Sequence, residues 1–233
     1  MSIAENIARI REEMKAAAIA AGRNPDSILL CAATKMNDAA AVRAAIAGGV
    51  DVCGENRVQE LMQKMSENAY AGAPVHFIGH LQTNKVKQVV GKVDLIQSVD
   101  SLHLLEAIQR EAARQGIRQE ILLEVNIGAE ESKSGFAPEE IPALVDRFSD
   151  FPNIFLQGLM AIPPISHFSG GNTKFFQKMY ALTVDITTKK VDNVCVDVLS
   201  MGMSDDFADA IACDSTMIRV GTAIFGRRNY NPA

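Results

Sequence analysis

Short apolar runs alternate with helix-like segments along almost the whole chain, and this rhythm constrains the fold more than any other feature. The runs are apolar without a polar residue at every second position, which is typical of strands buried on both faces of a parallel sheet. The stretches ILLCAA (28–33) and EILLEVNI (120–127) show this clearly. Six further runs are expected to form strands: 50–54, 75–80, 94–99, 154–160, 193–200 and 217–221.

The segments between these runs have the spacing of helices. Residues 2–21 repeat apolar residues on one helical face, and Ser2 with Glu5 matches the capping box that begins many helices. Ser204 is expected to cap the helix that precedes the last strand. The other helices are expected over 38–47, 56–67, 83–90, 101–115, 138–150, 173–190 and 204–212.

Eight strand–helix units in 233 residues predict an α/β fold, a single (β/α)₈ TIM barrel spanning residues 1–233 as one domain. A doubly wound open sheet is the alternative. No Gly-x-Gly-x-x-Gly motif follows the first strand, which weakens a dinucleotide-binding interpretation of that alternative.

Composition excludes several classes of protein. The net charge of −5 does not fit a broad basic surface for nucleic acid. The charged N-terminus is no secretory signal, and the uncharged stretch 151–173 is broken by prolines, so no membrane span is expected. The four cysteines form no CxxC pair or zinc-like cluster, which predicts no metal site and a reducing, cytoplasmic location. Cys31 and Cys53 lie in apolar strand-like runs and are expected to be buried.

Polar residues follow the predicted strands, at the end of a barrel where active sites lie. Lys35 comes directly after the first strand. A lysine at the rim of an apolar barrel is partly desolvated, which lowers its pKa, and a neutral amine can form a Schiff base with an aldehyde. A surface lysine that begins a loop is the simpler alternative.

The loops after the seventh and eighth strands often bind phosphate in such barrels. Ser200 ends the seventh strand, and Gly221 with Thr222 follows the eighth. A glycine lets the backbone approach a phosphate closely, and the hydroxyls add donors. The alternative is that these glycines only make turns. Asp205 and Asp206 would repel a phosphate and are expected to face solvent.

A Schiff-base lysine and a phosphate site on one rim indicate an aldehyde that carries a phosphate. Pyridoxal 5′-phosphate (PLP) fits, and so does a sugar phosphate in a lysine-dependent aldolase. Arg219 lies two residues before the second phosphate loop and could face a pyridine nitrogen, which it would leave unprotonated because arginine only donates. A structural salt bridge is the alternative role for Arg219.

At these residues the chain resembles the pyridoxal-phosphate homeostasis proteins, also called the YggS or PROSC family. The matching segments run in order from about residue 28 to 226 and include AATKMNDAAAVRAAIAGGVDVCGENRVQE, HFIGHLQTNKVK, LLEVNIGAEESKSGF, LSMGMSDDFADAI and STMIRVGTAIFG. The resemblance implies a barrel like the N-terminal domain of alanine racemase. It also implies PLP joined to Lys35, with its phosphate at Ser200, Gly221 and Thr222 and Arg219 at the pyridine nitrogen. Further contacts are expected from Asn56, His80, Met160, Met201 and Ser204.

Two positions depart from the family pattern. Asp214 stands where members commonly have glycine, so a positive φ there would carry some cost. Arg57 replaces a residue that is often aromatic and adds a positive charge near the rim.

Whether the chain is a PLP carrier or a PLP-dependent amino-acid enzyme depends on the presence of a second catalytic base. The resemblance implies that racemases of this fold pair the lysine with a tyrosine from a second domain; here the chain ends at Ala233, and Tyr70, Tyr180 and Tyr230 follow no predicted strand. We therefore expect a non-enzymatic PLP carrier, a monomer or weak homodimer, with PLP-dependent apo-enzymes as candidate recipients. A PLP-dependent racemase or related amino-acid enzyme remains the main alternative, and a sugar-phosphate aldolase the next.

Overall fold

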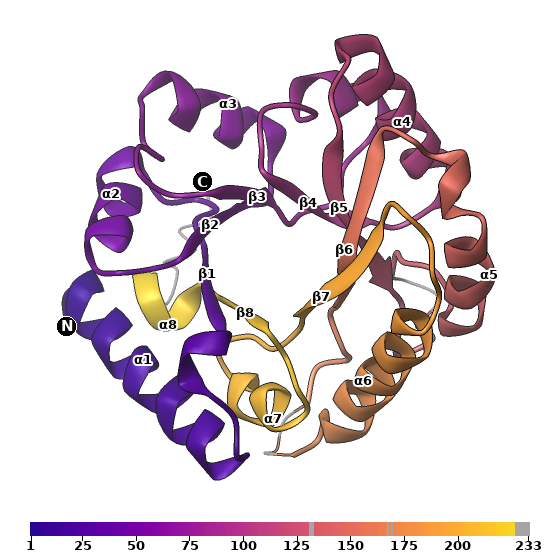
Figure 1. Cartoon of the computed structure of the whole chain (residues 1–233). Coiled ribbons are helices and arrows are strands. Elements are labelled where there is room, and N and C mark those ends of the chain that lie inside the picture. Colours follow the sequence, from indigo (N-terminus) through magenta and orange to yellow (C-terminus); the bar gives the residue numbers. More distant parts are fainter. Residues whose placement is uncertain (131–132, 167, 169, 227–233) are drawn as a thin grey trace.

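Eight parallel strands close into a barrel in chain order, so that β1 is hydrogen-bonded to both β2 and β8 (Figure 1). The computed structural model describes residues 1–130, 133–166, 168 and 170–226. The closed barrel confirms the predicted fold and rules out the open-sheet alternative. The strands are β1 (Leu29–Ala33), β2 (Val52–Glu55), β3 (Val75–Phe77), β4 (Leu95–Val99), β5 (Gln119–Val125), β6 (Ile154–Ala161), β7 (Val194–Ser200) and β8 (Met217–Val220).

Helices surround the barrel, and α1 lies against α2, α7 and α8 (Figure 1). The capping box of α1 is present, because Ser2 Oγ accepts from the Glu5 N–H while Glu5 Oε2 accepts from the Ser2 N–H. The α-helices are α1 (Ile3–Ala20), α2 (Ala39–Ala47), α3 (Val58–Ser66), α4 (Leu102–Gln115), α5 (Ile141–Asp146), α6 (Thr173–Thr187), α7 (Phe207–Ala212) and α8 (Thr222–Phe225). Short 3₁₀ segments are Pro25–Ser27, Thr83–Gln88, Pro138–Glu140 and Phe148–Asp150.

The prediction that Ser204 caps the helix before β8 is wrong. That helix, α7, begins at Phe207 with Asp206 at its N-cap. The Asp206 carboxylate accepts hydrogen bonds from the Met203 N–H and the Asn172 amide, both at 2.7 Å. These bonds hold residues 203–206 in a turn, so the helix starts later than the sequence suggests.

The segment predicted as a helix over 83–90 forms a 3₁₀ turn instead, at Thr83–Gln88. It is short and contains the β-branched residues Thr83 and Val86, which favour α-helix less than unbranched ones. Its role in the fold is unchanged, since it still connects β3 to β4 on the outside of the barrel.

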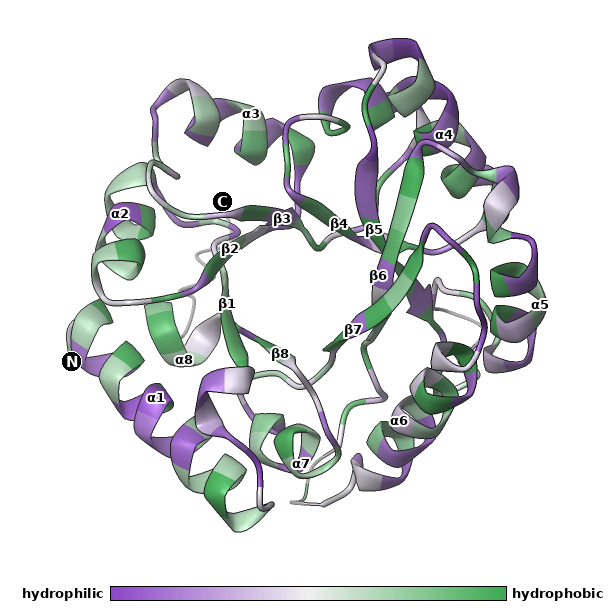
Figure 2. Ribbon diagram, in the orientation of Figure 1, coloured by the Kyte–Doolittle hydropathy of each residue, from purple (hydrophilic) through white to green (hydrophobic). Residues whose placement is uncertain are grey.

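Apolar side chains pack on both sides of the strand wall, as the continuous apolar runs predict. Leu30 and Ala32 of β1 belong to the large cluster that joins strands to helices, whereas Cys31 belongs to a separate cluster with Val52 and Met217. Successive side chains of a strand point to opposite faces, so this second cluster fills the barrel interior. Figure 2 shows the resulting ring of mainly hydrophobic strands inside helices of mixed hydropathy.

The same alternation places polar side chains inside the barrel, closer to the carboxyl ends of the strands than the apolar cluster. Gln97 follows Leu95 on the inner face of β4, Glu124 follows Leu122 on β5, and Arg219 follows Met217 on β8. Across the described ranges, no helix is long and apolar enough to cross a membrane.

Candidate cofactor site at the barrel mouth

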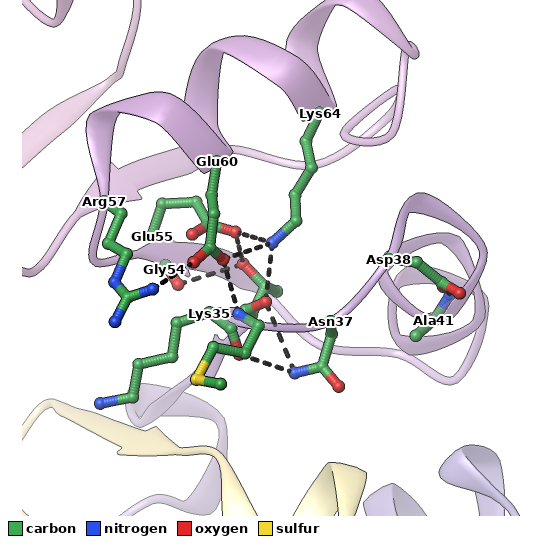
Figure 3. Close-up of polar contacts among 11 residues, drawn as sticks. Lys35, Asn37, Asp38, Ala41, Gly54, Glu55, Arg57, Glu60 and Lys64 are labelled. Atoms are coloured by element: carbon green, nitrogen blue, oxygen red, sulfur yellow. Dashed lines mark hydrogen bonds and ion pairs between the residues drawn. The ribbon is translucent and has the colours of Figure 1, made fainter. Parts of the chain in front are cut away.

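Lys35 lies two residues beyond the end of β1, on the rim formed by the carboxyl ends of the strands. It is half-buried, and its backbone carbonyl accepts a hydrogen bond from Asn37 Nδ2 at 3.0 Å. Figure 3 shows its side chain extending away from Lys64, a second lysine on α3. The structure therefore puts Lys35 at the mouth of the barrel, where the sequence predicts it.

Arg219 is 5 % exposed and lies at one end of a hydrogen-bonded chain across the barrel interior. Its Nη1 donates to Ser200 Oγ at 2.6 Å, and its Nη2 donates to the Ala161 carbonyl at 2.9 Å. Ser200 Oγ in turn donates to Gln97 Oε1 at 2.7 Å, and Gln97 Nε2 lies 2.9 Å from His76 Nδ1. The chain Arg219–Ser200–Gln97–His76 fixes the direction in which the guanidinium points.

His76 must accept at this end of the chain, because an amide nitrogen only donates. Burial lowers the pKa of His76 to about 4, since the charged ring is disfavoured away from water. The neutral form of His76, which the lowered pKa favours, is also the form that can accept the hydrogen bond from Gln97.

We predict that this histidine makes the protein acid-sensitive. The pKa of this histidine is about 6.5 in the unfolded chain. Between pH 6.5 and 4, His76 is therefore protonated in the unfolded state but neutral in the folded state. The contribution of His76 to the free energy of unfolding is fully present above this pH range and falls by about 2–3 kcal/mol between pH 7 and 4.5. Urea unfolding at both pH values measures it.

His76→Gln tests the assignment, because that variant should lose less stability on acidification than the wild type. His103→Gln is the matched control, since His103 is exposed and should leave the pH dependence unchanged. An identical acid-induced loss in the wild type and in His76→Gln would contradict the prediction.

The loops after β7 and β8 meet, as the predicted phosphate site requires. The Arg219 N–H donates to the Gly202 carbonyl at 3.0 Å, and the Ala223 N–H donates to Ser204 Oγ at 3.4 Å. Gly221 and Thr222 stand at the start of α8, beside these contacts. Ser200, in contrast, is fully buried with its hydroxyl proton directed to Gln97, so a phosphate contact from that hydroxyl would require the proton to turn away.

Asn56 and His80 follow β2 and β3 on the same rim but differ in their surroundings. Asn56 Oδ1 is buried and has no hydrogen-bond partner among the described residues. Gly79 packs directly on Asn56, because a Cβ at that glycine would lie 2.2 Å from the Asn56 carbonyl oxygen. The His80 side chain is 63 % exposed and pairs with Asp100 through Nδ1 at 2.9 Å.

The two methionines predicted to touch the cofactor lie on opposite sides of the strand wall. Met160 is buried inside the barrel with Leu95 and Leu122. Met201 is fully buried in the cluster shared by strands and helices. The structure therefore brings only Met160 to the barrel interior.

The two departures from the family pattern have defined environments. Asp214 has φ +66°, so it adopts the left-handed conformation that glycine accepts more readily, and it pairs with Arg23 at 3.4 Å. Arg57 has a side chain that is 65 % exposed and lies 3.5 Å from Glu60. The turn at Asp214 is thus retained.

Glu124 is a rim residue that the sequence reasoning missed. It lines a cavity of about 250 Å³ together with Asn126, Lys133 and Ser134. Burial raises its pKa, as does the nearby Asp100 charge, while Arg219 and His80 act in the opposite direction. The signal was present in EILLEVNI, because a strand that turns Leu122 inward turns Glu124 inward as well.

The residues at the mouth fit a PLP-like group by their chemistry. Lys35 offers an amine for an aldehyde. Arg219 is a buried donor, and none of the described carboxylates forms an ion pair with it within 4.0 Å. The unpartnered Asn56 Oδ1 adds an acceptor. The described part of the chain offers no cluster of three or more His, Cys, Asp or Glu able to hold a metal ion.

Residues 2–229 match the family described as "Alanine racemase, N-terminal domain". A pyridoxal phosphate homeostasis protein of Pseudomonas aeruginosa is 39% identical over 229 residues, which cover 98% of this chain and 97% of that protein. The chain belongs to the pyridoxal phosphate homeostasis protein family. The resemblance inferred from the sequence is thereby confirmed.

Solved structures of similar proteins share the whole barrel. An unknown protein from Bifidobacterium adolescentis has a TM-score of 0.90 at 38% identity, covering 96% of this chain and 94% of that chain. PipY of Synechococcus elongatus, solved with PLP bound, has a TM-score of 0.82 at 32% identity, covering 97% of this chain and 100% of that chain. A relative that this chain matches over its full length therefore has a structure that contains PLP.

Proposed function

We propose that this chain binds PLP at the barrel mouth through a Schiff base to Lys35, and that it stores or delivers the cofactor in the cell without transforming an amino acid. The observation that carries the proposal is the meeting of Lys35, Arg219 and the loops after β7 and β8 at one end of the barrel. A PLP-bound relative of 32% identity and the homeostasis name of the P. aeruginosa protein support it.

Bound PLP supplies an aldehyde and a ring that can accept electrons when its nitrogen is protonated. Arg219 would face that nitrogen as a donor that keeps its own proton. The hydrogen bonds to Ser200 and the Ala161 carbonyl hold the guanidinium in place. The ring would then withdraw electrons weakly, which suits a protein that holds PLP more than one that breaks bonds to an amino acid.

The described tyrosines offer no second base at the mouth. Tyr70 lies between α3 and β3, and burial raises its pKa, so it stays protonated. Tyr180 lies within α6, on the outside of the barrel. Tyr230 falls outside the described residues. This placement supports the carrier over the racemase.

Delivery to an enzyme is the first test. We predict that the PLP-loaded protein restores activity to a PLP-dependent apo-enzyme faster than its spontaneous release of PLP allows. The control is the same protein after borohydride reduction, which fixes the cofactor to the lysine and should restore nothing. Reactivation no faster than measured PLP release would contradict delivery.

Glu124 is the one observation that favours a racemase or related amino-acid enzyme. Its raised pKa and its place at the mouth suit a group that exchanges protons. The test is exchange of the α-proton of amino acids in deuterated water. Exchange that is lost in both Lys35→Ala and Glu124→Gln would establish this second function, and the absence of exchange across a panel of amino acids would exclude it.

A further inference from the structure

Two buried charges lie directly behind the backbone that carries Lys35 (Figure 3). Lys64 of α3 and Glu55 at the end of β2 approach to 2.5 Å between Nζ and Oε1, and their side chains are 5 % and 0 % exposed. Glu60, one helical turn before Lys64, adds a second carboxylate at 3.5 Å from the same Nζ. We call Glu55, Glu60 and Lys64 the ion cluster.

The ion cluster binds the main chain on both sides of Lys35. Lys64 Nζ donates to the Thr34 carbonyl at 2.8 Å, and the Thr34 hydroxyl donates to Glu55 Oε1 at 2.5 Å. On the other side, Glu60 Oε2 accepts from the Met36 N–H at 2.6 Å. The residue before Lys35 and the residue after it are therefore both held by the cluster.

The turn after Lys35 needs such support. Met36 has φ +61°, in the left-handed region that costs a residue with a side chain roughly 1–2 kcal/mol. The hydrogen bond to Glu60 holds the N–H of this strained residue in one direction. Without it, the backbone is expected to relax and to change the angle at which Lys35 leaves the strand.

Stability alone does not explain the ion cluster. A buried ion pair is often no more stabilising than apolar residues of the same size, because both charges must leave water. What apolar residues cannot provide is a set of directed bonds to chosen backbone groups. The bonds to Thr34 and Met36 are of that kind, and they flank the one residue that the proposed chemistry uses.

We propose that Glu60, Lys64 and Glu55 are positioning residues for Lys35. They hold the backbone of residues 34–36 so that the Lys35 amine meets an incoming aldehyde in a reactive direction. This inference rests on the proposed function, because it concerns the same lysine. None of the three residues is placed in contact with the cofactor.

Glu60 is the position to test, because its side chain is 20 % exposed and its replacement should leave the fold intact. Glu60→Ala removes the bond to Met36, whereas Glu60→Gln keeps an acceptor oxygen for it. Gln63→Ala is the matched control on the same helix, since it removes only an exposed hydrogen bond to Glu67. The readout is the rate at which visible absorption rises when PLP is added to each apo-protein, with melting temperature recorded alongside.

Glu60→Ala is expected to slow the capture of PLP roughly tenfold, since small misplacements of a reacting group have large effects on rate. Glu60→Gln should recover most of the rate, and Gln63→Ala should match the wild type. Capture by Glu60→Ala at the wild-type rate would overturn the proposal, and so would equal slowing in Glu60→Ala and Glu60→Gln. Failure of the wild type itself to trap PLP on Lys35 would instead refute the proposed function.

Discussion

Replacing Lys35 with alanine is expected to abolish the visible absorption of the PLP-loaded protein. A Schiff base requires a primary amine, and Lys35→Ala removes it, while Lys64 and Lys133 are each held by a carboxylate. Lys64 is buried against Glu55, and Lys133 pairs with Glu130 at 2.5 Å. The melting temperature of the apo-protein should change little, because Lys35 lies on the rim outside the apolar core.

Lys35→Arg is the matched control, since arginine keeps the charge and the reach but forms no Schiff base with an aldehyde. Both variants should lose the band, which would separate covalent attachment from simple attraction of the phosphate. Absorption of wild-type intensity and position in Lys35→Ala would contradict the assignment of this residue.

Replacing Lys64 with methionine is expected to lower the free energy of unfolding by about 3–5 kcal/mol, because it leaves the carboxylate of Glu55 buried without a counter-charge, with only the Thr34 hydroxyl still donating to it. Glu55 is fully buried, and its Oε2 already lacks a hydrogen-bond partner among the described residues. The double variant Lys64→Met with Glu55→Gln removes both charges and should recover part of that loss. Urea unfolding of the two single variants and the double variant measures the coupling.

Gln63→Ala again serves as the control on the same helix and should change stability by less than about 0.5 kcal/mol. Losses that simply add in the double variant would show that the two charges do not depend on each other. In that case the ion pair would have no energetic role in holding the backbone behind Lys35.

The barrel and the rim that carries the candidate site were predictable from the sequence because they depend on local patterns. Apolar runs of strand length, separated by helices, identify the strands, and the residue after each run then falls on one rim. Lys35 and Gly221 were located in this way. The start of α7 was not, because the Asp206 carboxylate accepts hydrogen bonds from Met203 and Asn172 rather than from the first turn of its own helix.

Side-chain contacts between different elements could not be predicted from these patterns. A lysine within an amphipathic helix is ordinarily solvent-exposed, so nothing in VQELMQKMS indicates that Lys64 is buried. Its partner Glu55 lies nine residues earlier on a different element. The hydrogen-bonded network from Arg219 to His76 likewise joins β8, β7, β4 and β3. The register of these strands relative to one another is fixed only when the barrel closes.

The two-residue alternation of strand side chains could have assigned more residues to the barrel interior than the sequence analysis did. Alternation along β7 separates Ser200, inside the barrel, from Met201, which faces the helices. Applied in the same way to β5, it places Glu124 inside. Which face a residue occupies could thus have been derived by counting from one buried interior residue on each strand.

Reduction with borohydride followed by peptide mapping tests the central claim most directly. The protein is loaded with PLP, reduced, digested and analysed for a phosphopyridoxyl group. The account predicts that this group is found on Lys35. Labelling of another residue, such as Lys133, with Lys35 unmodified would contradict it, and so would the absence of any label in protein that had been mixed with excess PLP.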